Sequence, residues 1–461
     1  MTPAALRRIG IPAFLLLSLH VFSQPHIGGT VRLDTRQGLI ECDFRLSGLP
    51  ALSEYRILLN HGMNIQYFRD DSLRQIYYDG WYGGRMKGEA LEYVLMKNDR
   101  DTLRPLPSSF RIRYRGAFPV YNDTLNIFDF KGLIAFNGKT VRATEQSKWY
   151  PVIYDVKADR LVDTYTYSIR VESANSKTIY LNGSAPVQQS GKTLVSNTPR
   201  ALFLFAGDYG FIRSGKDYLL NVPAGKSIAD KIFAELNRIK VFHAKNLGIT
   251  YNEGVYLINH EAVKKYRDGQ SWGFTVFPSF AYAHLDFTKL VDSNGKFNND
   301  NLAFFAHELS HYYFGGNVIS GNLQWFWLES TTEYLSLKAA EALADTAYYN
   351  GVLAKYSSFA RNQQYKPLSR IVSPGEIDEN YRYVYGPLIW ICYEKTFGLD
   401  ATYKTLAGLV RRSAKESLSL ETLRAVSLAN GIRGTEYDRF YSAFLDGDAA
   451  LLNVCTLAAG R

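Results

Sequence analysis

The sequence predicts an α+β protein in which a β-rich N-terminal half is followed by a mainly helical half. Up to about residue 215, short apolar and aromatic runs alternate with turn residues, whereas from residue 300 onward the apolar residues recur at helical spacing. The length of 461 residues also favours two domains, because single hydrophobic cores seldom grow beyond about 250–300 residues.

The first residues have the pattern of a secretory signal peptide. Arg7 and Arg8 precede an apolar run over residues 11–19, which is too short to cross a bilayer. We expect cleavage near Ser23 or Gln24 and therefore a secreted or periplasmic chain without stable membrane insertion, with an uncleaved anchor as the alternative. The expected divisions are a signal peptide over 1–24, a β-rich domain over 25–220 and a second domain over 221–461.

The β-rich half shows the period-two alternation that is typical of half-buried strands. It is clearest over residues 39–46, 110–114 and 165–171, and Asn182-Gly183 after residues 178–181 predicts a tight turn. Many short strands without intervening helices favour a β-sandwich or a saddle-shaped sheet.

The second half is expected to begin with a helix over residues 227–242. Strands are predicted over 254–258 and 272–277, and the chain from Asp300 onward reads as helical.

The composition is that of a folded, water-soluble protein, with 46% hydrophobic and 21% charged residues. The formal charge is +9, but the basic residues form neither a run nor a stripe with aromatic residues, so we expect no nucleic-acid partner. Cys42, Cys392 and Cys455 are odd in number and widely spaced, so at most one disulfide can form.

The strongest chemical signal is the run HELSH at residues 307–311, with a helix cap available among residues 298–300. His307 and His311 are four apart and lie one turn apart on one helical face, so both can reach one tetrahedral zinc ion. Glu308 lies beside them, where a carboxylate can take a proton from water. Chance alone produces this pattern on the order of once per hundred such sequences, so a further ligand is needed to support it.

A second predicted helix supplies that ligand. Glu329 lies 18 residues beyond His311, and two histidines with one carboxylate leave the fourth position of a zinc ion open, as catalytic sites do. Glu333, one turn later, can orient a ligand histidine, although both glutamates also have an alternative interpretation as solvent-facing helix charges. The remaining histidines that we considered have no metal-ligand spacing and are expected to be structural: His61, His243, His260 and His284.

At these residues the chain resembles the gluzincin metallopeptidases, and most closely the aminopeptidase N family. The segment 312–315, YYFG, and the tryptophan-rich run 325–328 before Glu329 repeat the layout of that family. The resemblance implies a saddle domain, a thermolysin-like catalytic domain over 221–461, one Zn²⁺ per chain and hydrolysis of peptide bonds in a peptide or protein substrate. Glu308 would be the general base, and we expect the family's C-terminal helical-repeat domain to be absent.

Two further features of the family, the spacing of its glutamate ligand and its oxyanion-binding tyrosine, are matched only in part by this chain. Its glutamate ligand usually lies 19 positions beyond the second histidine, where this chain has Ser330, which cannot bind zinc as a carboxylate does. Its Tyr-x-Lys-Gly segment is implied to hydrogen-bond the oxyanion, and Tyr383 in the segment YVYG looks like that tyrosine. Tyr381 and Tyr385 are the alternatives.

Substrate specificity is the point at which the chain departs from the resemblance. Family members carry Gly-x-Met-Glu-Asn on an edge strand, and its glutamate is implied to bind the free α-amine of the substrate. Alignment on Trp272-Gly273 places Gln270, an uncharged amide, at the position of that glutamate. The hypotheses are therefore an aminopeptidase-like enzyme, an endopeptidase or peptidase of atypical N-termini, and a noncatalytic binding protein that zinc stabilises.

Overall fold

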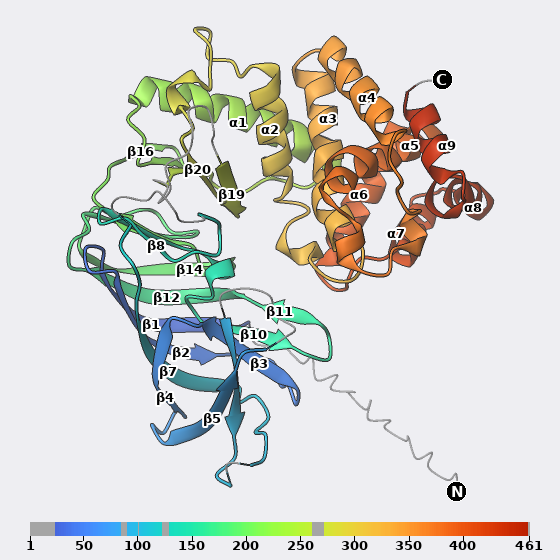
Figure 1. Cartoon of the computed structure of the whole chain (residues 1–461). Coiled ribbons are helices and arrows are strands. Elements are labelled where there is room, and N and C mark those ends of the chain that lie inside the picture. The colour runs from blue at the N-terminus through green and yellow to red at the C-terminus, as the bar shows by residue number, and fades with distance from the viewer. Residues whose placement is uncertain (1–23, 84–89, 100, 122–128, 261–271, 460–461) are drawn as a thin grey trace, which may run out of the picture.

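The computed structural model describes residues 24–83, 90–99, 101–121, 129–260 and 272–459. A strand-rich N-terminal half lies beside a mainly helical C-terminal half (Figure 1), which confirms the predicted fold class. The predicted signal peptide, apart from its last residue, lies outside the described residues.

The N-terminal half is organised around a curled sheet of eleven strands in the order β11-β10-β3-β6-β5-β4-β7-β2-β1-β12-β14 (Figure 1). Alternate residues of β2, β7 and β12 are buried, as the period-two pattern predicts. The strands are β1 (His26–Asp34), β2 (Leu39–Ser47), β3 (Tyr55–Asn60), β4 (Met63–Arg69), β5 (Gln75–Trp81), β6 (Ala90–Met96), β7 (Ser109–Ala117), β10 (Val152–Asp155), β11 (Arg160–Val162), β12 (Thr164–Ser173) and β14 (Gly191–Ala201).

A smaller sheet in the order β13-β15-β9-β8 packs on the large one, and the N-terminal core contains buried side chains from both sheets. Its strands are β8 (Ala135–Phe136), β9 (Thr140–Ala143), β13 (Thr178–Leu181) and β15 (Leu204–Gly207). The predicted turn after β13 is present, and Gly183 takes the positive φ of 86° that favours glycine.

The second half begins with a five-stranded sheet in the order β16-β17-β18-β20-β19, in which β19 is an edge strand. The domain boundary at residue 220 remains a prediction, and β16 and β17, which precede it, hydrogen-bond into this sheet. The strands are β16 (Phe211–Ser214), β17 (Asp217–Leu220), β18 (Tyr256–Asn259), β19 (Trp272–Val276) and β20 (Ser279–Ala283).

Helix α1 (Lys226–Leu247) and helix α2 (Asn299–Ser310) share a hydrophobic core with this sheet, and the remaining helices continue that core toward the C-terminus (Figure 1). The Asn298 side chain caps α2 by accepting a hydrogen bond from the N–H of Asn301. The later α-helices are α3 (Thr331–Leu343), α4 (Thr346–Ala360), α5 (Gly386–Phe397), α6 (Leu399–Ser413), α7 (Leu420–Ala429), α8 (Gly434–Phe440) and α9 (Ala450–Ala458).

In the described part of this half, three π-helices and several 3₁₀ turns lie between or next to the α-helices. The π-helices are η4 (Phe326–Ser330), η7 (Tyr381–Tyr385) and η8 (Tyr441–Asp446). The 3₁₀ turns are η2 (Phe287–Lys289), η3 (Gly316–Val318), η5 (Leu368–Arg370) and η6 (Pro374–Glu376), with η1 (Glu145–Ser147) in the N-terminal half.

The two halves share buried contacts. A cluster of aromatic and aliphatic side chains contains Tyr180 and Phe203 from the first half and Tyr256 from the second. Beside it, Asn182 donates hydrogen bonds to the carbonyls of Ala201 and Phe277, at 3.0 and 2.9 Å. Asn182 is fully buried, and its hydrogen bond to Phe277 joins the two halves.

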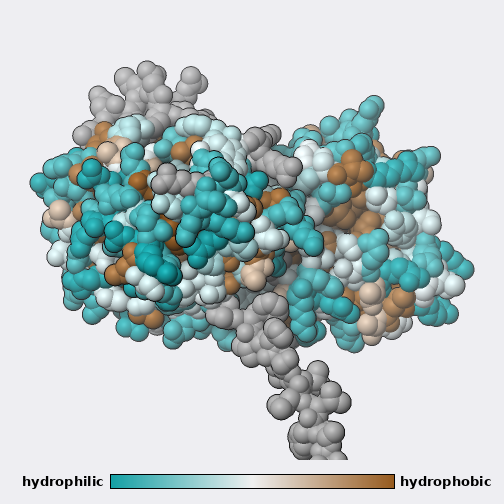
Figure 2. All heavy atoms as spheres, turned by 90° about the horizontal axis from the view of Figure 1, so that it is seen from below, coloured by the Kyte–Doolittle hydropathy of each residue, from teal (hydrophilic) through white to brown (hydrophobic). Residues whose placement is uncertain are grey.

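The face shown in Figure 2 is mainly hydrophilic, and its apolar side chains form small, separate patches. Within the described part of the chain, no helix is long and apolar enough to span a membrane. The three cysteines are buried and unpaired.

Candidate metal centre

The two histidines of the HELSH run lie at the C-terminal end of α2 and present their imidazoles on one face. Their ring centroids are 5.1 Å apart. The side chains of His307 and His311 are 10% and 12% exposed, so the site is largely enclosed but still open to a small ligand.

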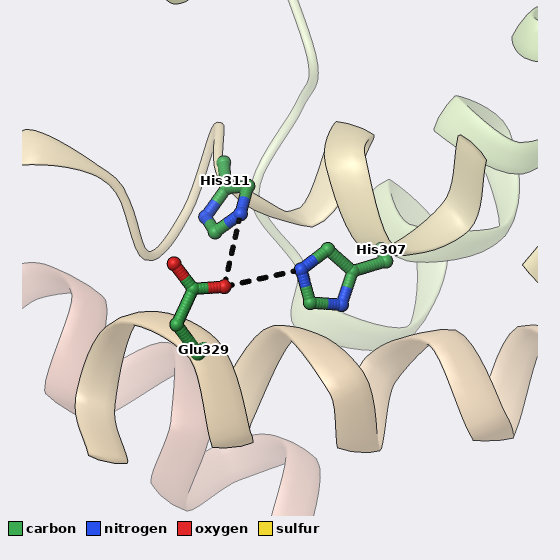
Figure 3. A group of neighbouring side chains, drawn as sticks. All are labelled: His307, His311 and Glu329. Atoms are coloured by element: carbon green, nitrogen blue, oxygen red, sulfur yellow. Dashed lines mark hydrogen bonds and ion pairs between the residues drawn. The ribbon is translucent and has the colours of Figure 1, made fainter. Parts of the chain in front are cut away.

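Glu329 reaches both imidazoles from the π-helix η4 (Figure 3). Its Oε2 lies 3.3 Å from His307 Nε2 and 3.7 Å from His311 Nε2. Among the described residues, these three form the one group of His, Cys, Asp and Glu side chains that could hold a metal, with ligand atoms within 4.8 Å of one another. The neighbouring Ser330 is fully buried, and a Cβ at Gly386 would collide with its hydroxyl. Glu329 rather than Ser330 therefore lies beside the histidines.

Hydrogen bonds to the outer ring nitrogens fix how the imidazoles are oriented. His307 Nδ1 lies 2.8 Å from Glu333 Oε2, and the other oxygen of Glu333 accepts a hydrogen bond of 2.8 Å from Tyr356. His311 Nδ1 lies 3.1 Å from the carbonyl of Phe314. Because a carbonyl and a carboxylate both require a donor, Nδ1 carries a proton in each ring, and Nε2, which faces Glu329, is the nitrogen that would bind a metal after releasing any proton of its own.

Glu329 and His307 shift each other's pKa values toward the charged forms. Burial would raise the pKa of Glu329, but its hydrogen bond with His307 and the charge of His311 lower that pKa to about 2. Burial would lower the pKa of His307, but hydrogen bonds with Glu329 and Glu333 raise it well above the usual value. Glu329 is thus kept ionised beside the imidazoles.

The donor set fits a zinc ion. In a tetrahedral site, N and O ligands about 2.0–2.1 Å from the metal lie roughly 3.3–3.5 Å from one another. The separations of 3.3 and 3.7 Å between Glu329 Oε2 and the two Nε2 atoms are close to those values. Two imidazoles and one carboxylate are also the ligand types of hydrolytic zinc sites.

Glu308 follows His307 on α2 and is half-buried. Its carboxylate accepts a hydrogen bond at Oε2 from the hydroxyl of Thr275 on β19. The sequence pattern did not single out Thr275; the signal that could have found it is its place in the predicted strand 272–277, just before the metal helix.

Of the three tyrosines considered for the oxyanion, Tyr383 is the one that lies at the site. Its ring centroid is 5.7 Å from that of His307, and its phenol hydrogen-bonds to Glu329. Tyr381 and Tyr385 are buried, and each packs against Tyr365. Burial, followed by the charge of Glu329, raises the pKa of Tyr383 far above the ordinary value, so its phenol stays protonated. Gln270 lies outside the described residues.

Comparison with known proteins finds likeness in structure alone. No family model and no curated protein matches the sequence. Leukotriene A4 hydrolase from Saccharomyces cerevisiae is 14% identical with a TM-score of 0.64, over 92% of this chain and 68% of that chain. The M1 zinc metallopeptidase from Deinococcus radiodurans is 16% identical with a TM-score of 0.60, over 92% of this chain and 93% of that chain.

A mutant of the Deinococcus enzyme bound to a Tyr-Ser-Ala substrate is also 16% identical, with a TM-score of 0.59, over 92% of this chain and 94% of that one. At these identities the likeness is one of fold. The chain has the gluzincin aminopeptidase-like fold of the M1 zinc metallopeptidases.

Proposed function

We propose that this chain is a secreted or periplasmic zinc metallopeptidase that hydrolyses peptide bonds. The observation that carries the proposal is the convergence of His307, His311 and Glu329 on one point, with Glu308 on the same helix as the histidines. Structural zinc sites are closed by four protein ligands, whereas three ligands and a nearby carboxylate are typical of hydrolytic sites. The Tyr-Ser-Ala bound to the Deinococcus enzyme supports a peptide as the substrate class.

His307, His311 and Glu329 would hold the ion, and Glu333 would orient His307. When bound, zinc supplies Lewis-acid chemistry, by which a carbonyl is polarised and water becomes more acidic. Glu308 accepts the proton of the attacking water at its carboxylate and later donates it to the leaving amine.

Tyr383 serves as the donor to the oxygen that becomes negatively charged as water adds to the carbonyl. Its phenol is protonated at neutral pH, and it lies against the same carboxylate, Glu329, that completes the metal group. A fixed donor at such a position stabilises developing charge without reorganisation, which lowers the barrier by several kcal/mol.

The proposal is tested by measuring zinc content and hydrolysis of an unbiased peptide mixture by the purified chain. We expect about one zinc per chain, because the donor set is a single open tetrahedral group. Hydrolysis should stop on chelation and return with added zinc. Glu308→Gln should keep the zinc and the thermal midpoint but lose at least about a hundredfold in kcat, because an amide cannot accept the proton.

Glu416→Gln is the matched control, because Glu416 forms an exposed ion pair with Arg412 and makes no contact at the site. It should retain both zinc and activity. Stoichiometric zinc in a chain that cleaves no peptide would contradict the proposal and favour a noncatalytic, zinc-stabilised binding protein.

Within this function, we propose a weaker preference for a free N-terminus than an aminopeptidase with a glutamate anchor has. The support is the sequence alignment that places Gln270 at the amine-binding position, since an amide offers a dipole but no charge. Matched free and N-acetylated peptides distinguish the two cases. If the wild-type chain disfavours acetylated peptides a thousandfold or more, roughly 4 kcal/mol, another carboxylate anchors the amine.

A further inference from the structure

Glu308 is held in place by a strand that belongs to the edge of the second sheet. Thr275 on β19 donates its hydroxyl to Oε2 of Glu308, across 33 residues of sequence. That bond occupies Oε2, so Oε1 is the oxygen that would accept the proton of the reacting water. Because Thr275 is β-branched, its side chain has few rotamers, so the position of its hydroxyl follows that of the strand backbone.

A residue without a side chain lets β19 lie against an aromatic ring that packs on α2. Gly273 lies two positions before Thr275 and therefore points to the same face of the strand. A Cβ at this glycine would collide with the ring of Tyr282, which packs on Phe304 and Phe305 of α2 at centroid distances of 5.6 and 6.3 Å. The strand thus rests on the helix through the Tyr282 ring.

The N-terminal half contacts the same strand residue through its backbone carbonyl. Lys131 donates a hydrogen bond of 2.9 Å from Nζ to the carbonyl of Thr275, 144 residues away in the sequence. Its ammonium group also forms a 2.5 Å ion pair with Glu145, and the Thr144 hydroxyl donates to the Lys131 carbonyl at 2.7 Å. Among the described strands, β19 has a neighbour on one side only, and Lys131 supplies a donor from outside the sheet.

We propose that Thr275 and Lys131 are positioning residues for the general base, with Lys131 acting through Thr275. Glu145 orients Lys131, Lys131 fixes the carbonyl of Thr275, and the Thr275 hydroxyl orients the carboxylate of Glu308. The inference rests on the proposed peptidase function. It assigns to the N-terminal half a part in the chemistry of a site whose ligands and base all come from the other half.

The test compares kcat and KM for Thr275→Val, Thr275→Ser, Lys131→Met and the double variant Thr275→Val/Lys131→Met. A base displaced by about 1 Å costs on the order of a hundredfold, so Thr275→Val should lower kcat by roughly 10- to 100-fold with KM nearly unchanged. Thr275→Ser keeps the hydroxyl and should recover most of the loss. Lys131→Met should lower kcat less, by a few fold.

The double variant separates positioning through Thr275 from a direct effect of the charge. If Lys131 acts through Thr275, the double variant is no worse than Thr275→Val alone, whereas independent effects would multiply. Lys177→Met is the matched control, because Lys177 forms an exposed 2.9 Å pair with Asp208 in the same half. It should leave kcat unchanged.

Further measurements exclude loss of zinc or of folding as the cause of a lower kcat. Zinc content and thermal midpoint should be those of the wild type, and a crystal structure of metal-free Thr275→Val should show the Glu308 carboxylate rotated away from its wild-type position. A wild-type chain that cleaves no peptide overturns the proposed function and this inference with it. An active wild type whose Thr275→Val variant keeps its kcat overturns the inference alone.

Discussion

Glu329 and Ser330 are adjacent on η4 but have different surroundings. Glu329 contacts both imidazoles, while Ser330 is buried against Gly386. We expect Glu329→Gln to lower zinc affinity at least about tenfold, because a neutral amide replaces the charged ligand. Ser330→Ala should keep the affinity, as measured by competition with a chromophoric chelator. The reverse result would mean that the ligand has been assigned to the wrong one of the two residues.

Much of the site's geometry follows from residues that the sequence singles out. Helical spacing brings His307 and His311 to one face, and Glu333, which we predict to orient a ligand histidine, lies 2.8 Å from His307. Thr275 and Lys131 could not be predicted in the same way. Their contacts span 33 and 144 residues, and a lone Thr or Lys has no spacing that marks it as part of a site.

Helices α1 and α2 meet at a buried histidine whose ionisation should affect stability. His243 of α1 lies 3.2 Å from the hydroxyl of Ser310 on α2 and is fully buried. Burial lowers the pKa of His243 to about 4, and a hydrogen bond with the Ala306 carbonyl offsets this only in part. The ring is therefore neutral in the folded protein at pH values where it is charged in the unfolded chain.

Between the ordinary pKa of about 6.5 and the folded value, the unfolded chain binds a proton that the folded protein does not. Stability should therefore fall as the pH falls from about 6.5 to about 4, by up to roughly 3 kcal/mol from this group. His243→Gln should reduce the difference in urea stability between pH 7 and pH 4.5 by roughly 2 kcal/mol. His61→Gln, at an exposed position, is the control; an unchanged difference in His243→Gln would contradict the prediction.

The helices of the second half were predictable as helices, but the π-turns within them were not. Hydrophobic spacing indicates a helix over residues 325–334. The local sequence does not distinguish the i→i+5 hydrogen bonds of a π-helix from the i→i+4 hydrogen bonds of an α-helix. At this turn Ser330 of η4 lies against Gly386, the glycine that begins α5. Such a contact joins segments far apart in the chain, so local hydrophobic spacing does not reveal it.

At the scale of the whole molecule, the buried bonds of Asn182 connect the two halves. Its amide donates to Phe277, and Ser279 donates to its carbonyl oxygen at 2.6 Å. Asn182→Ala should lower the free energy of unfolding by about 2 kcal/mol, because the Phe277 carbonyl and the buried Ser279 hydroxyl both lose the Asn182 side chain as a partner. Calorimetry should show a lower midpoint and separation of the unfolding of the two halves. Asn362→Ala, at an exposed helix end, should remain within about 0.5 kcal/mol of the wild type.

The order of strands in the large sheet could not be predicted from the sequence, because it depends on contacts between distant segments. Alternation marks β2, β7 and β12 as strands, but the parallel pairing of β1 with β12 joins His26 to Thr166. Such a pairing is chosen by the overall packing and not by either strand's own pattern. The sequence could therefore indicate a saddle or sandwich without specifying which strands are neighbours.

The π-helices at Glu329 and Tyr383 bear on how distant relatives of this chain can be recognised. A π-turn accommodates one residue more than an α-turn, so a single insertion or deletion can be absorbed there without moving the elements on either side. Fixed intervals between motif residues are therefore a poor search criterion on these segments. A search that lets the interval from His311 to the acidic ligand vary between 18 and 19 residues would include both this chain and the aminopeptidase N pattern.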